Sequence, residues 1–156
     1  MCDQADDGSV RMAVRRKEGC EDIELPRYET PGSSGMDVRA AVEDDLVIEP
    51  GKVALVPTGL FVAVPTGYEV QVRPRSGLAL RNMISVLNAP GTIDSDYRNE
   101  VGIILANLGP EPFTVTRGMR VAQMIIAPAP QARLVEVEEL DETQRNLGGF
   151  GSTGSH

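Results

Sequence analysis

Histidine is almost absent from this chain of 156 residues, because the only one is the last residue, His156. Catalytic triads and zinc sites that depend on histidine therefore have no material here. Cysteine is scarce as well. Cys2 and Cys20 have neither the number nor the spacing of a disulfide framework or a metal site, which favours a reducing, intracellular setting.

Long apolar runs and an excess of positive charge are also missing. No stretch approaches the roughly 18 apolar residues that a membrane span requires, and no charged-then-apolar leader opens the chain, so we expect a soluble, cytoplasmic protein. Fifteen basic residues stand against 23 acidic ones, for a formal net charge of -8. This balance argues against a surface that binds duplex nucleic acid. Any phosphorylated ligand must instead meet a local cationic site.

What the sequence does contain is a series of short segments rich in valine, isoleucine and leucine. Several alternate apolar and polar residues, as half-buried strands do, and turn signals such as Pro50-Gly51 and Gly109-Pro110 separate them. The segments are VRMAV, DLVIE, KVALV, GLFVAV, YEVQVR, EVGIILAN, FTV, VAQMIIA and RLVEVEEL. The pattern predicts an all-β domain of the sandwich or barrel type.

The length fits one domain, which we divide into three parts. Residues 1–9 are acidic, small and polar, and are expected to be a mobile N-terminal segment. Residues 10–144 form the β domain, and residues 145–156 form a glycine-rich C-terminal arm that is expected to be flexible. Within the domain, SGLALRNM (Ser76–Met83) suits a helix of one or two turns better than a strand.

The stretch RPRSGLAL, residues 73–80, places two arginines and a serine at the start of this helix. A helix N-terminus has unpaired amide hydrogens and a partial positive charge, so it can hold phosphate oxygens. Ser76 and the Gly77 amide are the natural donors, and Arg75 adds charge. The alternative is a plain serine N-cap beside a solvated arginine.

Two further stretches carry polar groups among strand residues. SSGMDVRA includes Asp37, which either orients water on a hard cation such as Mg²⁺ or simply caps a turn. In GMRVAQMI, alternation sends Arg120 and Gln123 to opposite faces of a strand. Both can point at one site only if a bulge intervenes.

The stretch APGTIDSDYRNE, residues 89–100, holds three acids directly behind a Pro-Gly pair. A polar surface turn is the plain interpretation, because glycine, proline, aspartate and serine are what tight turns require. Asp94, however, follows a β-branched residue in what looks like a hairpin, and a buried carboxylate beside a ligand could deprotonate a water molecule. Asp96 and Glu100 are expected to be solvated or paired with Arg98.

The C-terminal segment offers one more candidate, in which Arg145 precedes GGFGSTG. Glycine-rich segments let backbone amides close around phosphates, and an aromatic ring can stack on a base. Such compositions are also typical of flexible chain ends.

Taken in order, these five stretches resemble the five motifs of the trimeric dUTP pyrophosphatase family, the dUTPases. SGMDVRA resembles the first motif, RPRSGLA the second, NAPGTIDSDYRNEV the third, GMRVAQMI the fourth and RNLGGFGSTG the fifth. Each is unspecific alone, but five in the right order and spacing, from about Val10 to Gly154, are highly specific.

The resemblance implies a jelly-roll-like β-clip barrel and a homotrimer whose active sites are built from all three subunits. It implies hydrolysis of dUTP to dUMP and pyrophosphate, by attack of water on the α-phosphate with Mg²⁺ as cofactor. Such a dUTP diphosphatase keeps uracil out of DNA and supplies dUMP for dTMP synthesis. The implied partners are dUTP, dUMP and the other subunits, without nucleic acid or membrane.

By matching position, the resemblance also implies roles for single residues. Asp94 is the general base and a partner of the sugar 3'-hydroxyl, and Gln123 contacts phosphate in the catalytic centre. Asp37 acts on Mg²⁺ through bound water. The substrate-binding positions are Arg75, Ser76, Gly77, Asn88, Gly91, Thr92, Ile93, Tyr97, Arg145, Phe150, Gly151 and Ser152.

These positions divide among the parts of the nucleotide. Asn88 and the hairpin backbone from Gly91 read the edge of uracil, and Tyr97 lies against the deoxyribose and excludes a 2'-hydroxyl. Arg75, Ser76 and Gly77 hold the phosphate chain. From the arm, Arg145 pairs with the γ-phosphate, Phe150 stacks over uracil and Ser152 touches phosphate oxygens. Arg120 more often supports such a site than touches substrate.

The chain departs from the family pattern at Asn99, where glycine is common, and at Asn146-Leu147, where small residues are usual. Asparagine tolerates left-handed backbone angles, so the hairpin geometry is in question rather than the base. Two other functions are compatible with the fold. A regulatory nucleotide-binding protein is disfavoured because every catalytic-type position is filled. A dCTP deaminase needs an acid/base glutamate and usually lacks the tyrosine-containing hairpin motif.

Overall fold

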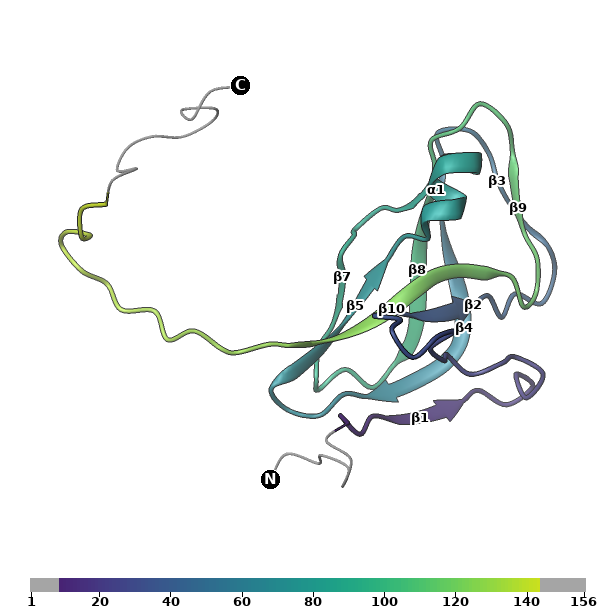
Figure 1. Ribbon diagram of the computed structural model, residues 1–156. Coiled ribbons are helices and arrows are strands. Elements are labelled where there is room, and N and C mark those ends of the chain that lie inside the picture. Colours follow the sequence, from purple (N-terminus) through teal and green to yellow (C-terminus); the bar gives the residue numbers. More distant parts are fainter. Residues whose placement is uncertain (1–8, 144–156) are drawn as a thin grey trace.

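The computed structural model describes residues 9–143, which form ten β-strands and one short helix (Figure 1). The strands are β1 (Ala13–Arg16), β2 (Met36–Arg39), β3 (Leu46–Ile48), β4 (Val53–Ala63), β5 (Tyr68–Arg73), β6 (Ile84–Val86), β7 (Gly91–Ile93), β8 (Glu100–Asn107), β9 (Phe113–Val115) and β10 (Arg120–Pro128). The helix α1 spans Ser76–Asn82. The expected all-β class with one short helix is confirmed. The division at residues 9 and 144 stays a prediction, because nearly all of both end segments lie outside the described residues.

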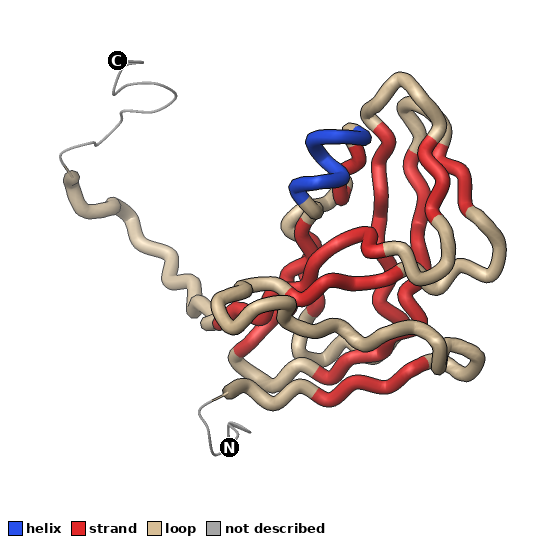
Figure 2. The backbone as a smooth tube through the Cα atoms, turned by 45° about the vertical axis from the view of Figure 1, so that its right-hand side comes forward, coloured by secondary structure: helices blue, strands red, loops and turns tan. Residues whose placement is uncertain are grey.

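The strands form three antiparallel sheets. One has the order β1-β4-β8-β6, the second β2-β10-β5-β7, and the third pairs β3 with β9. Within residues 9–143 no sheet closes on itself, so the expected barrel is a set of open sheets around a shared core. Figure 2 shows these strands gathered in one body, from which the chain after β10 runs away as a loop.

One cluster of buried aliphatic side chains joins the sheets. Val38 and Met124 from the second sheet belong to the same cluster as Ile103 and Leu105 from the first, and each of the four has no exposed surface. Each fully buried side chain of this kind stabilises the fold by roughly 1.5–3 kcal/mol. The strands that carry the candidate site residues are thus held by burial on their inner faces.

The strand β4 joins two segments that the sequence predicts as separate strands, KVALV and GLFVAV. Its pairing with β8 shifts register between Pro57 and Phe61, so a bulge absorbs the proline and glycine that suggested a break. Inside the bulge the Thr58 hydroxyl donates to the Val101 carbonyl at 2.6 Å and replaces a lost ladder bond. The strand remains continuous because the Thr58 side chain satisfies a backbone group of β8 at the irregular part.

Residues 129–143 contradict the prediction of a strand at RLVEVEEL, because no strand or helix is found there. Leu134, Val135 and Leu140 are 93%, 70% and 85% exposed. A strand needs a neighbouring strand to satisfy its backbone groups, and this segment lies beside none.

No helix in the described part of the chain is both long enough and apolar enough to cross a bilayer.

Arg117, in the turn before β10, fastens the N-terminal loop to the domain. Its guanidinium donates to both carboxylate oxygens of Asp22, at 2.7 and 2.8 Å, and to the carbonyls of Gly19 and Val42 at 2.8 and 3.1 Å. The hydrogen bonds from Arg117 lower the pKa of the Asp22 carboxyl. The same contact raises the pKa of Arg117.

We expect Asp22→Asn to lower the melting temperature modestly at pH 7 and to have no effect in strong acid. A carboxyl whose pKa is lowered by folding stabilises the protein above its ordinary value near 4, and this contribution is lost as the pH falls through the folded value. Thermal unfolding of both proteins between about pH 2 and 8 measures the difference. Asp44→Asn, which changes another exposed acid, is the control. A difference that persists undiminished at the lowest pH would contradict this account.

Candidate active site

The hairpin that was predicted to read a base is built on β7. This strand pairs with β5, with Gly91 opposite Val72 and Ile93 opposite Val70. A β-carbon at Gly91 would lie only 3.1 Å from Nδ2 of Asn88, so the Asn88 amide rests directly against the backbone of β7. The structure therefore brings together the two groups expected at the base edge, and only glycine leaves them this close.

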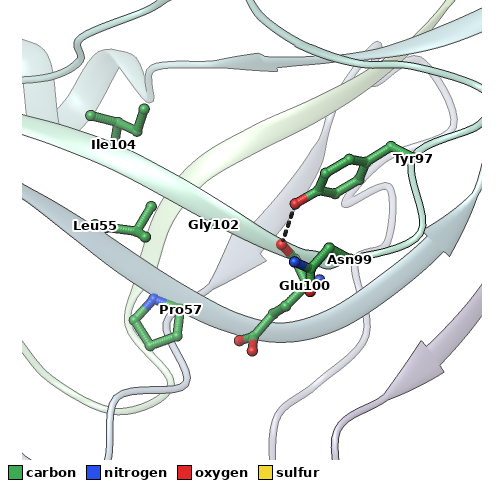
Figure 3. A pocket seen from close by; sticks show the side chains of 7 residues that line it. All are labelled: Leu55, Pro57, Tyr97, Asn99, Glu100, Gly102 and Ile104. Carbon is green, nitrogen blue, oxygen red and sulfur yellow. Dashed lines mark hydrogen bonds between the residues drawn. The ribbon is translucent and has the colours of Figure 1, made fainter.

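Asp94 and Tyr97 follow β7 in a tight turn. The Asp94 carbonyl accepts the Tyr97 amide at 3.2 Å, and the Tyr97 hydroxyl donates to the Glu100 carbonyl at 2.9 Å (Figure 3). The Asp94 side chain is exposed in the single chain rather than buried. Tyr97 lines a hollow of about 440 Å³ together with residues from β4 and β8. The candidate base and the candidate sugar contact thus sit on one hydrogen-bonded turn.

Glu100 is neither fully solvated nor paired with Arg98, the two alternatives expected for it, and the prediction is wrong. The Arg98 guanidinium folds back and donates to two carbonyls of its own turn, at 2.7 and 2.8 Å. The half-buried Glu100 carboxylate accepts the Gly59 amide at 2.9 Å and lies 3.6 Å from the Lys17 ammonium. Asp96 is exposed, as expected of a solvated acid. Local sequence could not find this partner, because Gly59 is some forty positions away in the chain.

Asn99 does not need the left-handed backbone that its place in the motif suggested. Among the described residues Met83 is the only non-glycine residue with a positive φ. The Asn99 side-chain oxygen instead accepts the Glu100 amide at 2.8 Å. The departure from glycine is therefore accommodated without backbone strain. The second departure, Asn146-Leu147, lies outside the described residues.

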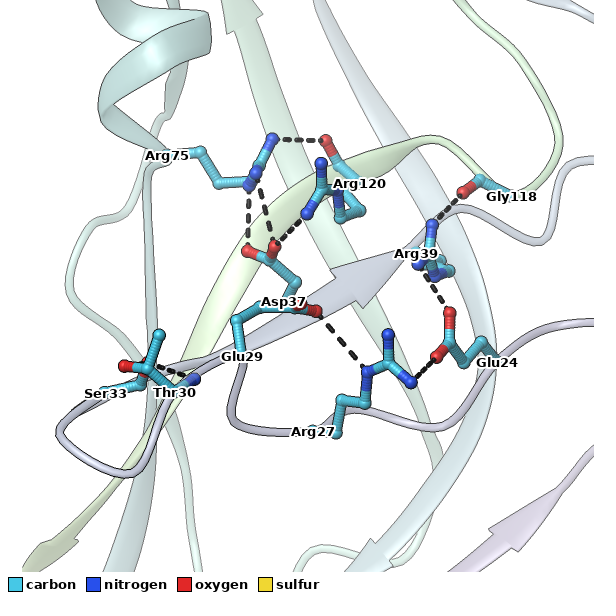
Figure 4. Close-up of polar contacts among 10 residues, drawn as sticks. All are labelled: Glu24, Arg27, Glu29, Thr30, Ser33, Asp37, Arg39, Arg75, Gly118 and Arg120. Atoms are coloured by element: carbon cyan, nitrogen blue, oxygen red, sulfur yellow. Dashed lines mark hydrogen bonds and ion pairs between the residues drawn. The ribbon is translucent and has the colours of Figure 1, made fainter.

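A second group of site residues surrounds Asp37 on β2 (Figure 4). Arg75 donates to both oxygens of this carboxylate, at 2.8 and 3.2 Å, and Arg120 donates to one of them at 3.1 Å. Arg39 on β2 lies directly opposite Arg120 on β10 in the strand register. The Arg39 guanidinium is paired with the Glu24 carboxylate at 2.6 Å. One carboxylate between two guanidinium groups leaves a local positive charge on an acidic protein.

Gln123 joins this second group because β10 contains the required bulge. The register against β2 shifts between Arg120 and Ala122, so Arg120 reaches Asp37 while Gln123 stands opposite Asp37 on the same face. The Gln123 amide donates to the Pro74 carbonyl at 2.9 Å. A β-carbon at Gly35 would lie 2.5 Å from the Gln123 side-chain oxygen, so Gly35 makes room for this side chain.

The start of α1 differs from the serine N-cap that was the plain alternative. The N-cap is Arg75, in extended conformation, and no side chain caps the helix. Ser76 is the first helical residue and is exposed. The first-turn amides are therefore not capped by any side chain, which is the condition for an anion to bind them.

The structure does not bring these two groups together within one chain. Because β7 is antiparallel to β5 and ends opposite Val70, Asp94 lies near the Tyr68 end of β5, whereas Arg75 follows its Arg73 end. The six residues of β5 separate these ends by about 17 Å. Within residues 9–143, no hydrogen bond or ion pair joins Asp94 or Tyr97 to the Asp37 group.

Several expected contributions cannot be placed. Arg145, Phe150, Gly151 and Ser152 lie outside the described residues. Within residues 9–143, no three acidic, histidine or cysteine side chains converge as a metal-binding group.

The two remaining expected positions, Thr92 and Ile93, lie in β7, where Ile93 is buried and Thr92 is exposed.

Comparison with known proteins covers most of the chain. A dUTPase family model matches residues 21–154. A deoxyuridine 5'-triphosphate nucleotidohydrolase of Caulobacter vibrioides is 58% identical over 147 residues, which cover 93% of this chain and 95% of the relative. One of Rhizobium johnstonii is 59% identical over 150 residues, covering 95% and 96%.

Solved structures resemble the fold at lower identity. A mutant dUTPase of Staphylococcus bacteriophage 80alpha, determined with dUpNHpp, has a TM-score of 0.83 at 22% identity and covers 94% of this chain and 99% of its own. A mutant dUTPase of phage phi11 of S. aureus, described with a structural Mg(II) ion, has a TM-score of 0.75 at 22% identity, covering 85% and 99%.

We expect Gly35→Ala to lower the free energy of unfolding by about 1–3 kcal/mol, because the new methyl group displaces the Gln123 side chain from its place beside Pro74. Urea denaturation measures the change. Gly32→Ala is the matched control, since a β-carbon there meets nothing within 4 Å, and it should change stability by less than about 0.5 kcal/mol. Equal effects of the two substitutions would remove the packing role of Gly35.

Proposed function

Since the chain belongs to the dUTPase family and hydrolyses dUTP to dUMP and pyrophosphate, we propose that its active site forms between two half-sites on neighbouring subunits of a homotrimer. The phosphate half-site consists of Asp37, Arg75, Ser76, Gly77 and Gln123. The nucleoside half-site consists of Asn88, Gly91, Thr92, Ile93, Asp94 and Tyr97. The reaction keeps uracil out of DNA and supplies dUMP for dTMP synthesis.

The observation that carries this proposal is the separation of the half-sites by the length of β5. One nucleotide has its base, sugar and triphosphate joined in a short chain, so it must meet both half-sites at once. Asp94 and Arg75 follow opposite ends of the strand ladder that joins β5 to β7. A second copy of the chain can supply the missing half without disturbing that ladder.

Exposed apolar surface supports the trimer. Leu55 is 67% exposed, and it lines the hollow beside Tyr97 with Pro57, Gly102 and Ile104. Figure 3 shows Leu55 and Pro57 on β4 and Ile104 on β8, to the left of the tyrosine ring. Contiguous apolar surface of this kind marks protein interfaces. Burying it against a neighbouring subunit would place Tyr97 at the subunit boundary. The exposed leucines and valines of residues 133–140 are further surface that a trimer would cover.

In the proposed reaction Asp94 acts as general base. It takes a proton from a water molecule that attacks the α-phosphorus, and the bond from that phosphorus to the bridging oxygen breaks to release pyrophosphate. Ser76, the Gly77 amide and Arg75 bind phosphate oxygens at the uncapped start of α1. Gln123 holds a further phosphate oxygen from β10. Catalysis is then mainly positioning and electrostatic stabilisation.

The nucleoside half-site selects the substrate. The backbone of β7 with the Asn88 amide reads the uracil edge, and its close approach excludes the thymine methyl group. Tyr97 lies against the deoxyribose, leaves no room for a 2'-hydroxyl, and places the sugar where the 3'-hydroxyl can donate a hydrogen bond to the Asp94 carboxylate. The hydroxyl of Tyr97 already donates a hydrogen bond to the Glu100 carbonyl, so the face of the ring is the part that contacts the sugar.

The residues present fit Mg²⁺ that is bound through water. Asp37 accepts three N–H groups from two arginines, so about one of its four lone-pair positions is left for a metal-bound water. Among the described residues, no cluster of acids offers direct ligation. Asp37 would therefore hold the ion through water while the substrate phosphates ligate it. When bound, Mg²⁺ would screen the phosphate charges and orient the triphosphate for in-line attack by water.

We also assign the C-terminal arm to the closed site. Arg145 would pair with the γ-phosphate, Phe150 would stack over uracil, and Gly151 and Ser152 would contact phosphate oxygens. Closing such an arm excludes bulk water and strengthens the electrostatic interactions inside the site.

We expect Asp94→Asn to keep dUTP binding and to lower kcat by at least about 10²–10⁴-fold, because the amide cannot take the proton. Pyrophosphate release measures kcat, and calorimetry with a non-hydrolysable dUTP analogue measures binding. Asp96→Asn, two residues away in the same exposed turn, is the matched control and should retain kcat. If Asp94→Asn turned over dUTP normally, another group would be the base.

A mixture of Asp94→Asn and Arg75→Ala subunits tests the shared site. Each variant alone lacks one half-site in every copy, so each should be nearly inactive. If the half-sites come from different subunits, randomly mixed trimers regain about one quarter of the wild-type activity, because a quarter of their sites pair two intact halves. Co-refolding the two variants and measuring pyrophosphate release gives the answer. Mixed trimers that stay as inactive as the separate variants would show that each site belongs to one chain.

A further inference from the structure

Glu100 is a half-buried acid that the proposed reaction does not use. It is the first residue of β8 and lies at the base of the turn that carries Asp94 and Tyr97. Its side chain is 22% exposed. Burying a charged group is costly unless strong partners compensate, so its partners indicate what it does.

The carboxylate of Glu100 completes the bulge in β4. It accepts the Gly59 amide at 2.9 Å, and Gly59 has a φ of +66°, where other residues are strained. A β-carbon at Gly59 would lie 2.7 Å from the Cys20 sulfur, so no side chain fits there. The Gly59 amide is buried and points out of the ladder, and Glu100 supplies the acceptor that it needs.

The bulge is fixed from its other side as well. The Lys17 amide donates to the Gly59 carbonyl at 2.7 Å, which attaches the end of β1. The Lys17 ammonium lies 3.6 Å from Glu100 but is half exposed, and an exposed pair of this kind contributes little. The hydrogen bond from Gly59 is therefore the strong part of the anchor, since a charged acceptor shortens and strengthens it.

The anchor leads directly to Tyr97. While the carboxylate of Glu100 points away from the tyrosine, its backbone carbonyl faces the ring and accepts the Tyr97 hydroxyl at 2.9 Å (Figure 3). The other hydrogen bonds of Tyr97 in residues 9–143 are made by its backbone, whose amide donates to the Asp94 carbonyl and whose carbonyl accepts the Arg98 guanidinium. The position of the ring therefore depends on where Glu100 holds its own carbonyl.

We propose that Glu100 is a positioning residue for sugar specificity. By binding the Gly59 amide it fixes the carbonyl that holds Tyr97, and so keeps the ring where a ribonucleotide 2'-hydroxyl would collide with it. This inference rests on the proposed role of Tyr97 against the deoxyribose. It assigns to Glu100 the discrimination between dUTP and UTP, not the hydrolytic step.

The measurement is the ratio of kcat/KM for dUTP to kcat/KM for UTP, determined by pyrophosphate release from the full-length protein. In Glu100→Ala the ratio should fall about 10-fold, the size of one lost hydrogen bond to a charged group, with KM for dUTP raised and kcat nearly kept. Glu100→Gln should restore the ratio, because its amide oxygen still accepts the Gly59 hydrogen. Lys17→Met, which removes only the exposed ion pair, is the matched control and should stay within about 2-fold of wild type.

A double-mutant cycle tests whether Glu100 acts through Tyr97. In a Tyr97→Phe background, which lacks the hydroxyl, Glu100→Ala should change the ratio no further. If Glu100→Ala does not fold, Glu100→Asp takes its place, because its shorter side chain cannot reach Gly59 from the same backbone, and the same fall is expected.

An unchanged ratio in Glu100→Ala with only a lower melting temperature would overturn the inference and reduce Glu100 to a structural residue. A fall in Glu100→Gln as large as in Glu100→Ala would overturn it too, because the acceptor would then not be the cause. Absence of dUTP turnover in the wild type would instead reject the proposed function, so the two failures are distinguishable.

Discussion

The strand β5 is hydrogen-bonded along both edges, to β10 on one side and to β7 on the other, and the two proposed half-sites depend on this double pairing. Its Arg73 end leads into α1 and the residues proposed to bind phosphate, while the register of β7 carries the chain toward the opposite end of β5 before Asp94. Moving Asp94 toward Arg75 within one chain would require breaking a ladder whose inner side chains, Val70 and Val72, are buried. A site shared between subunits is the arrangement that this topology favours.

Charge is managed in the same local way. The protein carries a formal charge of -8, yet its substrate is a polyanion. The proposed phosphate half-site is not acidic, because Asp37 is the only carboxylate that contacts Arg75 and Arg120 in the described part of the chain. That carboxylate keeps both guanidinium groups in place before a ligand arrives. Donors held in position in advance lose little by reorganising when charge develops.

Sequence reasoning succeeded where a local pattern is sufficient. The helix at SGLALRNM needs only its own residues, and the motif order identified the family now supported by relatives at 58% and 59% identity. It failed where a partner is distant. RLVEVEEL alternates like a strand, but alternation supplies no neighbour. Glu100 was expected to be solvated or paired with Arg98, because its real partner, Gly59, cannot be identified without the fold. The serine N-cap was wrong because composition cannot say where the first helical turn begins.

The two bulges show why such failures gather near the site. In β10 one extra residue lets Arg120 and Gln123 serve the same face, and in β4 the irregular backbone at Gly59 gives Glu100 a partner. Each bulge breaks the simple alternation on which strand prediction depends, and each places a side chain where regular pairing would not. Asn99 is a similar case. Its side-chain oxygen accepts the Glu100 backbone amide, and its backbone is not in the left-handed region. Departures from local regularity are thus the means by which an ordinary antiparallel framework positions groups for recognition.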